Sequence, residues 1–146
     1  AVADPLGGEA GHHRGGMEIG TVEVELQPEA ADDALMAGLP ARFEAHVVHR
    51  QSALQLPEGA VRLAGNAFEP TQAFRIGEQA WGLQFHPEFD AEIMRGYVDH
   101  PGDDLRGQGH DPAGDREPVG PNAAAAGLLG RFARIAEAHD ALATAT

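Results

Sequence analysis

The chain has 146 residues, of which 42% are hydrophobic, and this length suits one compact domain. Its formal net charge is −13, from 23 acidic residues against ten basic ones. A surface with this charge repels a phosphate backbone, which argues against nucleic acid as a direct partner. No stretch approaches the roughly 18 apolar residues of a membrane span, so we expect a soluble, cytoplasmic protein without a membrane partner.

Cysteine is absent, which removes disulfides, thiolate metal sites and a thiol nucleophile from this chain. The eight histidines raise the question of a metal site. His12 and His13 are neighbours on a Gly-rich stretch and imply no third ligand. His46 and His49 are three apart on an expected strand, hence on opposite faces. We expect no metal and no cofactor.

The first forty residues predict a helix end, one strand and one short helix. Residues 1–6 run into Gly7-Gly8, which suits the last turn of a helix, and a loop follows over 11–16. The alternation in 17–26 predicts a half-exposed strand with Glu18 on its polar side. Residues 28–40 have a helical composition closed by Gly and Pro, which predicts a single helix of about two turns.

Four further β segments are predicted between residues 42 and 88. Strands over 42–49 and 61–64 are separated by a Pro-Glu-Gly turn. The segments 71–77 and 79–88 form a hairpin around Gly77-Glu78. The second strand of this hairpin delivers His86 to its end.

The C-terminal part is predicted to be helical on both sides of a loop. A helix leaves at residue 90, with Asp90 as its N-cap. Residues 100–122 are rich in Gly, Pro and Asp, and predict a loop. Asn122 is expected to cap a final helix over 123–142, with its large apolar residues on one side and Arg131 outside. Strands mixed with helices indicate an α/β layered fold.

The triplet His86-Pro87-Glu88 is the sharpest chemical signal. A proline disfavours the helical region for the residue before it, so His86 is expected to be extended. Positions two apart on an extended chain point the same way, so Glu88 can orient one imidazole nitrogen of His86 and leave the other free as a base. A histidine oriented by a carboxylate is two thirds of a nucleophilic triad.

The string WGLQFHPE over 81–88, followed by FDAEIM, resembles the His-Pro-Glu signature of class I glutamine amidotransferases, closest to the domain type of GMP synthase and its stand-alone relatives. Upstream, RGGMEIGTVEV resembles the family's Gly-Arg-Glu strand and GLPARFEAHVVHRQSAL its Ser-His segment. GAVRLAGNAFEPTQAFRIG resembles the β segments that follow. The similarity spans roughly residues 3–97.

The resemblance implies hydrolysis of the glutamine amide to glutamate and ammonia through a Cys-His-Glu triad. His86 would be the base and Glu88 its orienting carboxylate. In relatives the backbone after the Ser-His histidine lies near the bound glutamine, so His49, Arg50 and Gln51 are candidates for substrate contact. The family's nucleophile lies on a Gly-x-Cys-x-Gly-x-Gln elbow, and the residues before Gly7-Gly8 match the end of the helix that follows this elbow. We therefore expect the cysteine just before the first residue of this sequence.

The sequence thus predicts an α/β fold: the C-terminal part of a three-layer α/β/α amidotransferase domain, rich in short strands and with a C-terminal helix. Residues 1–99 would form the partial domain, 100–122 the loop, and 123–142 a helix packing on the domain. The chain alone is expected to be inactive without the cysteine. Expected partners are glutamine and either the missing N-terminal half or a synthetase subunit. Two alternatives are a non-catalytic binding or regulatory module and another His-based hydrolase.

Overall fold

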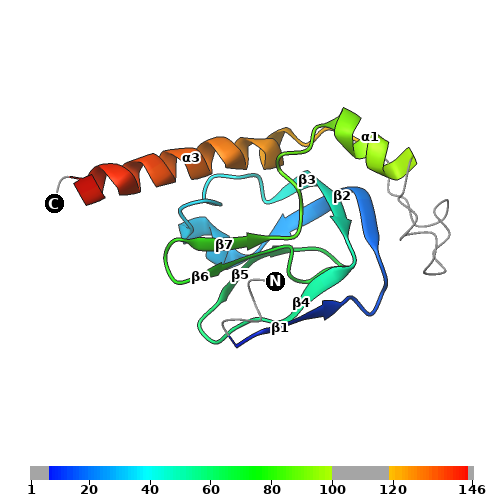
Figure 1. Cartoon of the computed structure of the whole chain (residues 1–146), viewed down its shortest axis with the longest axis horizontal. Helices are drawn as coiled ribbons and strands as arrows, with labels where there is room; N and C mark the ends of the chain where they lie inside the picture. Colours follow the sequence, from blue (N-terminus) through cyan, green and yellow to red (C-terminus); the bar gives the residue numbers. More distant parts are fainter. Residues whose placement is uncertain (1–6, 100–118, 145–146) are drawn as a thin grey trace.

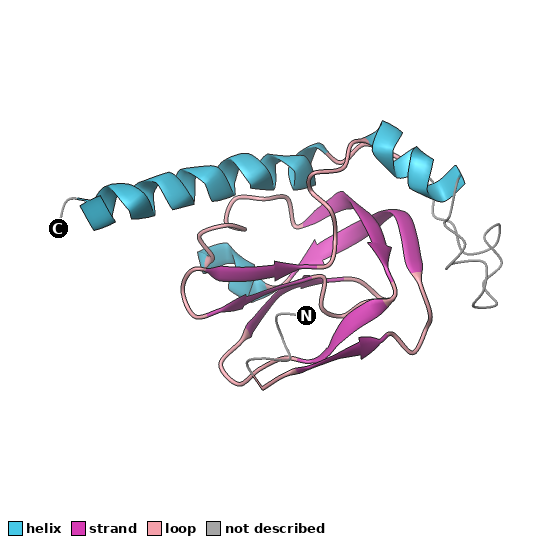
Figure 2. Cartoon of the chain, in the orientation of Figure 1, coloured by secondary structure: helices cyan, strands magenta, loops and turns pink. Residues whose placement is uncertain are grey.

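The computed structural model describes residues 7–99 and 119–144 and consists of two antiparallel sheets with the two α-helices along one side (Figures 1 and 2). The larger sheet has the strand order β3-β2-β5-β6-β7, and the smaller one pairs β1 with β4. The strands are β1 (Glu9–His12), β2 (Glu18–Leu26), β3 (Arg42–His49), β4 (Gln51–Gln55), β5 (Val61–Gly65), β6 (Ala73–Ile76) and β7 (Ala80–Leu83). The helices are η2 (Pro28–Asp32), α1 (Ala91–Asp99) and α3 (Ala123–Thr144).

The β2–β3 hairpin is the centre of the larger sheet and confirms both predicted strands. Its register runs from Glu18 opposite His49 to Glu25 opposite Arg42. Because side chains alternate along a strand, one face carries Val22 and Val24 into the main core, and the other carries Thr21 beneath α1 and the start of α3. The hairpin therefore has apolar packing on both faces near its open end.

The larger sheet nearly closes on itself through the residues that follow β7. Phe85 forms an antiparallel bridge with Val47 of β3, and the His86 N–H donates to the His46 carbonyl at 2.7 Å. The predicted hairpin around Gly77 is confirmed, with β6 paired to β7 from Ala73 opposite Leu83. This closure brings the His-Pro-Glu segment against β3, which lies about forty residues earlier in the sequence.

Helix α3 covers one side of the sheet, and its C-terminal end extends beyond the strands (Figure 1). Its residues Ala125 and Leu128 are buried in the main core. The expected outward position of Arg131 is wrong: its guanidinium donates to the carbonyls of Leu35 and Ala37. Phe132, expected on the packed side, is 50% exposed. The carbonyls of the 35–37 turn need donors, and Arg131 supplies them.

The predicted two-turn helix over 28–40 is also wrong, because Asp33 interrupts it. The helix η2 is a 3-10 helix of five residues, and Asp33 beyond it is extended, with φ −82° and ψ 132°. The buried Asp33 carboxylate accepts hydrogen bonds from the N–H groups of Leu35 and Met36, from Arg75 at 2.8 Å and from Trp81 at 3.0 Å. These partners hold Asp33 away from a helical conformation.

The predicted helix after the His-Pro-Glu segment is α1, and the Asp90 carboxylate caps it by accepting the Ile93 N–H at 2.8 Å. Asn122 precedes α3, and its carbonyl accepts the Ala126 N–H. Its side-chain amide donates to the Phe89 carbonyl at 2.9 Å. The helix end expected over 1–6 lies outside the described residues, as does most of the 100–122 loop, of which only 119–122 are described.

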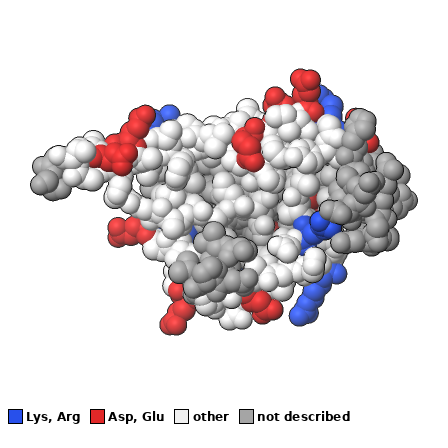
Figure 3. Space-filling view, in the orientation of Figure 1, with Lys and Arg blue, Asp and Glu red and all other residues white. Residues whose placement is uncertain are grey.

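The pairing of β1 with β4 was not predicted, and it occupies part of the region expected to be a loop. On the face shown in Figure 3, acidic side chains are scattered around the periphery and do not form one continuous patch. Among the described helices, none is both long and apolar enough to cross a membrane.

Candidate active site

His86 and Glu88 meet at the end of the strand that closes the larger sheet. The Nδ1 atom of His86 lies 2.7 Å from Oε1 of Glu88. The buried Pro87 stands between them, and the His86 backbone is fixed by the carbonyl of His46. The two side chains meet as predicted, but residues 86–89 form a turn and not the extended chain on which the prediction was based. The imidazole is 34% exposed and the carboxylate 51%.

The contact between His86 and Glu88 favours the ionised carboxylate. Partial burial alone would raise the pKa of Glu88, but its hydrogen bond with His86, a backbone hydrogen bond and the charge of His86 together lower it. A carboxylate accepts and cannot donate, so His86 donates from Nδ1. In neutral His86 the Nε2 atom then carries the lone pair. Nε2 has no hydrogen-bond partner within 7–99 and 119–144.

His86 lines a cavity of about 510 Å³ between the end of β7, the β3–β4 connection and β1. Six polar residues of this wall are His12, His49, Arg50, Gln51, Gln84 and His86. The structure therefore brings the three residues predicted to contact substrate, from the last residue of β3 to the first of β4, into one cavity with the predicted base. Glu88 borders this cavity only through its contact with His86.

His49 is fixed in this wall by Glu18, a residue that the sequence analysis placed on the polar side of its strand. The structure corrects this prediction, because Glu18 is only 7% exposed. Its Oε1 lies 3.0 Å from Nε2 of His49 and accepts from the Gln72 amide at 2.7 Å. Its Oε2 accepts from the Asn66 amide at 3.0 Å. These donors replace the water that a buried carboxylate loses.

The Glu18 network also holds the start of β4. The Nδ1 atom of His49 lies 3.2 Å from the Gln51 carbonyl, so both ring nitrogens face oxygen acceptors. Burial would raise the pKa of Glu18, but hydrogen bonds with His49, Asn66 and Gln72 and the charge of His49 lower it. Glu18 is therefore an ionised group that ties the backbone at Gln51 to the core.

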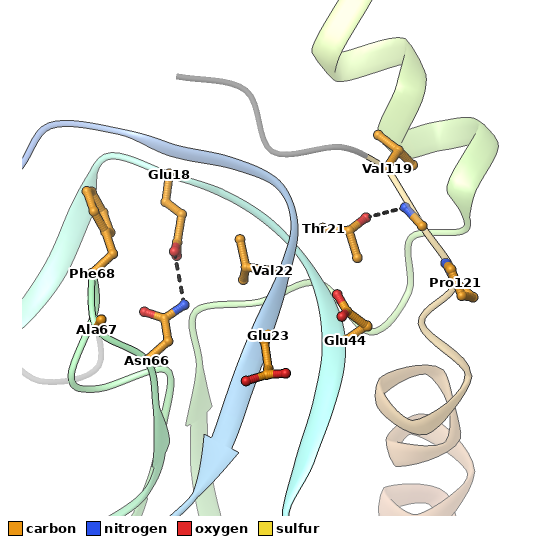
Figure 4. Close-up of a pocket in the computed structure, with 11 residues that line it drawn as sticks. Glu18, Thr21, Val22, Glu23, Glu44, Asn66, Ala67, Phe68, Val119 and Pro121 are labelled. Carbon is orange, nitrogen blue, oxygen red and sulfur yellow. Dashed lines mark hydrogen bonds between the residues drawn. The ribbon is translucent and has the colours of Figure 1, made fainter. Parts of the chain in front are cut away.

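A second cavity, of about 600 Å³, lies on the other side of Glu18 and is lined by β2, β3 and residues 66–68 and 119–121 (Figure 4). Within it Glu18 contacts Asn66, and the Thr21 hydroxyl accepts the Gly120 N–H at 2.9 Å. Glu23 and Glu44 stand opposite each other at its rim. The polar groups of Glu18 and Thr21 are already bound within the protein.

His46 lies on the opposite face of β3 from His49, as predicted. Its side chain is fully buried, and its Nδ1 lies 2.8 Å from the Thr21 hydroxyl. Thr21 also accepts the Gly120 N–H, and its hydroxyl proton remains available for Nδ1 of His46. Burial lowers the pKa of His46, and the charge of Asp90 partly opposes this shift. The structure thus makes His46 a neutral core residue.

No group of three or more His, Cys, Asp or Glu side chains among the described residues could hold a metal ion. In the site itself, Nδ1 of His86 and Nε2 of His49 are both engaged by carboxylates. Each carboxylate is thereby used as a hydrogen-bond acceptor. The site therefore offers proton transfer and polar binding from its own side chains.

The sequence model of the family described as glutamine amidotransferase class-I matches residues 1–97. The chain belongs to this family. A glutamine-hydrolysing GMP synthase from Porphyromonas gingivalis is 47% identical over 58 residues, which cover 39% of this chain and 12% of that protein. Gamma-glutamyl peptidase 3 from Arabidopsis thaliana is 29% identical over 99 residues, covering 64% of this chain and 39% of the relative.

A glutamine amidotransferase of known structure from Thermotoga maritima superimposes with a TM-score of 0.64 at 25% identity. The match covers 90% of this chain and 55% of the Thermotoga chain. The predicted fold class, an α/β fold representing part of an amidotransferase domain, is confirmed. The present chain thus spans about half of that solved amidotransferase and a smaller share of the two relatives.

Sequence reasoning missed Glu18, Asn66 and Gln72, which hold His49 in the wall of the site. It also missed His12 and Gln84, which line the cavity. The sequence around Glu18 did not indicate its burial, because the alternation of apolar and acidic residues in its strand places it on the polar side. Its burial depends on Gln72, 54 residues away, whose side-chain amide donates a hydrogen bond to the Glu18 carboxylate.

Proposed function

We propose that this chain supplies the His-Glu part of a Cys-His-Glu active site that hydrolyses γ-glutamyl amides, with glutamine as the first candidate substrate. The observation that carries the proposal is the 2.7 Å contact between His86 and Glu88 at the edge of a cavity that also holds His49, Arg50 and Gln51. The nucleophilic cysteine comes from residues outside this sequence, since the chain contains none.

The steps assigned to His86 follow from its free Nε2 atom. His86 takes the proton of the cysteine thiol, and the thiolate attacks the carbonyl carbon of the substrate amide. The resulting imidazolium protonates the departing nitrogen, so that ammonia leaves and a glutamyl thioester remains. His86 then takes a proton from water, whose oxygen attacks the thioester, and returns it to the thiolate. Glu88 keeps the ring in the tautomer that these steps need and stabilises its cationic form.

The wall opposite His86 fits the polar end of an amino acid. Arg50 carries the positive charge that a substrate α-carboxylate requires, and the ordered backbone around Gln51 offers hydrogen-bonding groups. Glu18 acts behind His49 and keeps this backbone in place. The name of the peptidase relative supports a wider class of γ-glutamyl compounds, and the name of the GMP synthase supports a synthetase partner that uses the ammonia.

We also propose that the amidotransferase part of the chain is residues 1–99, with 123–142 as a helix that packs on it. The family match over 1–97 and the burial of Ala125 and Leu128 support this division.

The test is release of glutamate from glutamine by the protein extended upstream, in its own reading frame, through a Gly-x-Cys elbow. His86→Gln should lower kcat by about 10³-fold, the range of a lost general base, and Glu88→Gln should cost less. His139→Gln, an exposed histidine on α3, is the matched control and should keep full activity. Full activity in His86→Gln would refute the proposed role. A γ-glutamyl dipeptide assayed in parallel decides between the two substrate types.

The second candidate is a non-catalytic binding module, and the absence of cysteine from the chain favours it. In that case the chain itself would bind glutamine, and the complete reading frame would carry no cysteine elbow. Isothermal titration of the chain with glutamine measures this directly. Hydrolysis by the extended protein that depends on His86 would exclude the second candidate.

A further inference from the structure

Phe89 follows the His-Pro-Glu triplet and is brought back onto His86 by a tight turn. The Phe89 N–H donates to the His86 carbonyl at 3.2 Å, which closes a four-residue turn around Pro87. The two rings stack with their centroids 4.3 Å apart and an angle of 7° between their planes. One face of the imidazole is therefore covered by an aromatic ring.

Two other elements hold Phe89 in this position. Tyr97 of α1 stacks on Phe89, with centroids 5.1 Å apart and an angle of 16°. The Asn122 amide, immediately before α3, donates to the Phe89 carbonyl at 2.9 Å. Phe89 also packs against the small apolar cluster around Met94. The Phe89 ring is thus held by α1, and the Phe89 backbone by the residue before α3, so its position does not depend on the turn alone.

Glu88 by itself does not determine how the His86 ring is oriented. Its carboxylate is about half exposed and makes one contact with the ring, at Nδ1. A single hydrogen bond leaves the ring free to tilt about the axis through that bond. Stacking on Phe89 removes this freedom because a tilt would separate the two faces. Glu88 and Phe89 therefore constrain the ring in two different directions.

We propose that Phe89 is a positioning residue for His86: it fixes the plane of the imidazole so that Nδ1 stays on Glu88 and Nε2 stays directed to the cavity. The role in catalysis rests on the proposed function, but the orientation itself is a property of this chain. When His86 becomes cationic, the face of Phe89 lies against that charge, an arrangement the ring quadrupole favours.

The experiment is nitrogen-15 NMR of the histidine side chains in this chain at about pH 8, above the ordinary titration range of imidazole. The wild-type chain should show His86 with its proton on Nδ1. Phe89→Leu should lower the Nδ1–H population by at least a factor of two and broaden the His86 signals, whereas Phe89→Tyr should restore them. An unchanged tautomer population in Phe89→Leu overturns the proposal.

Phe68→Leu is the matched control, because Phe68 stacks on His13 in the same manner, with centroids 4.2 Å apart and an angle of 15°. It should change the signals of His13 and leave those of His86 unchanged. The buried His46 reports whether each variant is folded. A change at His86 in Phe68→Leu equal to that in Phe89→Leu would overturn the proposal, since the effect would then not come from stacking.

The catalytic consequence is measured separately in the extended protein. Phe89→Leu should lower kcat about 10-fold with little change in KM, because it affects the base and not the substrate wall. Full kcat in Phe89→Leu, together with a loss in His86→Gln, would overturn the catalytic part of the proposal. A shifted tautomer in Phe89→Leu with full activity in His86→Gln would refute the proposed function and leave the positioning role standing.

Discussion

Replacing Glu18 tests whether the buried network behind the candidate site stabilises the fold. Glu18→Ala removes an acceptor that serves His49, Asn66 and Gln72 at 3.0, 3.0 and 2.7 Å. Gln72 is fully buried, so its amide would be left without a partner. A buried donor left unpaired costs about 1–3 kcal/mol, and Glu18→Ala removes the acceptor of three side chains. The contributions overlap, so we expect Glu18→Ala to lower the free energy of unfolding by about 3–5 kcal/mol.

Glu18→Gln should cost less, about 1–3 kcal/mol, because it keeps one acceptor oxygen but turns an amide toward the donor of Asn66. The control is Glu23→Gln on the same strand, whose side chain is 59% exposed and lies 3.8 Å from Arg42. An exposed pair of this kind contributes little, so the control should change the free energy of unfolding by less than about 0.5 kcal/mol.

The measurement is equilibrium urea unfolding at about pH 7, followed by circular dichroism and by the fluorescence of Trp81, the single tryptophan. The Glu18 pKa is lowered in the folded protein from its ordinary value of 4.5. Its contribution to stability is therefore complete above about pH 4.5 and is lost as the pH falls through the folded pKa. A cost below about 1 kcal/mol for Glu18→Ala would refute the reasoning.

The other predictions concern the core histidine and two glycines. The pKa of His46 is lowered in the folded protein, so its contribution to the free energy of unfolding should be complete above about pH 6.5 and be lost as the pH falls through the folded pKa. His46→Gln should remove this part of the pH dependence in thermal unfolding. Gly65→Ala places a Cβ 2.2 Å from the Pro70 carbonyl oxygen and should cost at least about 2 kcal/mol. Gly96 lies in the middle of α1, and a Cβ added there has no atom within 4 Å, so Gly96→Ala should instead raise the free energy of unfolding by about 0.5–1 kcal/mol. Equal changes for the two glycine variants in urea unfolding would contradict both predictions.

The strands were predictable where side-chain alternation and turn residues agreed. The strands predicted over 17–26 and 42–49 correspond to β2 and β3, and the β6–β7 turn has Gly77 at φ +63°, a conformation that glycine adopts at little cost. The contact between His86 and Glu88 was also predicted, although the backbone over 86–89 forms a turn around Pro87 and is not extended. In each case local covalent structure determines the result.

The buried charges were not predictable, because their partners lie far away in the sequence. Asp33 ends η2 through contacts with Arg75 and Trp81, more than forty residues later. Glu18 becomes buried because Gln72 and Asn66 supply donors. A local pattern assigns a carboxylate to the solvent, and only the tertiary fold shows whether enough donors surround it. The pairing of β1 with β4 was not predictable either, because neither strand shows a clear alternation and the two lie about forty residues apart.

Strand β3 connects the two sides of the candidate site. The carbonyl of His46 holds the backbone of His86, while its ring binds Thr21 on the far face of the sheet. Three residues later the same strand presents His49, locked by Glu18, to the cavity wall. Strand β3 therefore carries part of the predicted substrate wall and also binds the backbone of the predicted base. A shift of β3 moves them together, so their separation across the cavity is maintained by backbone pairing and not by direct contact between the two side chains.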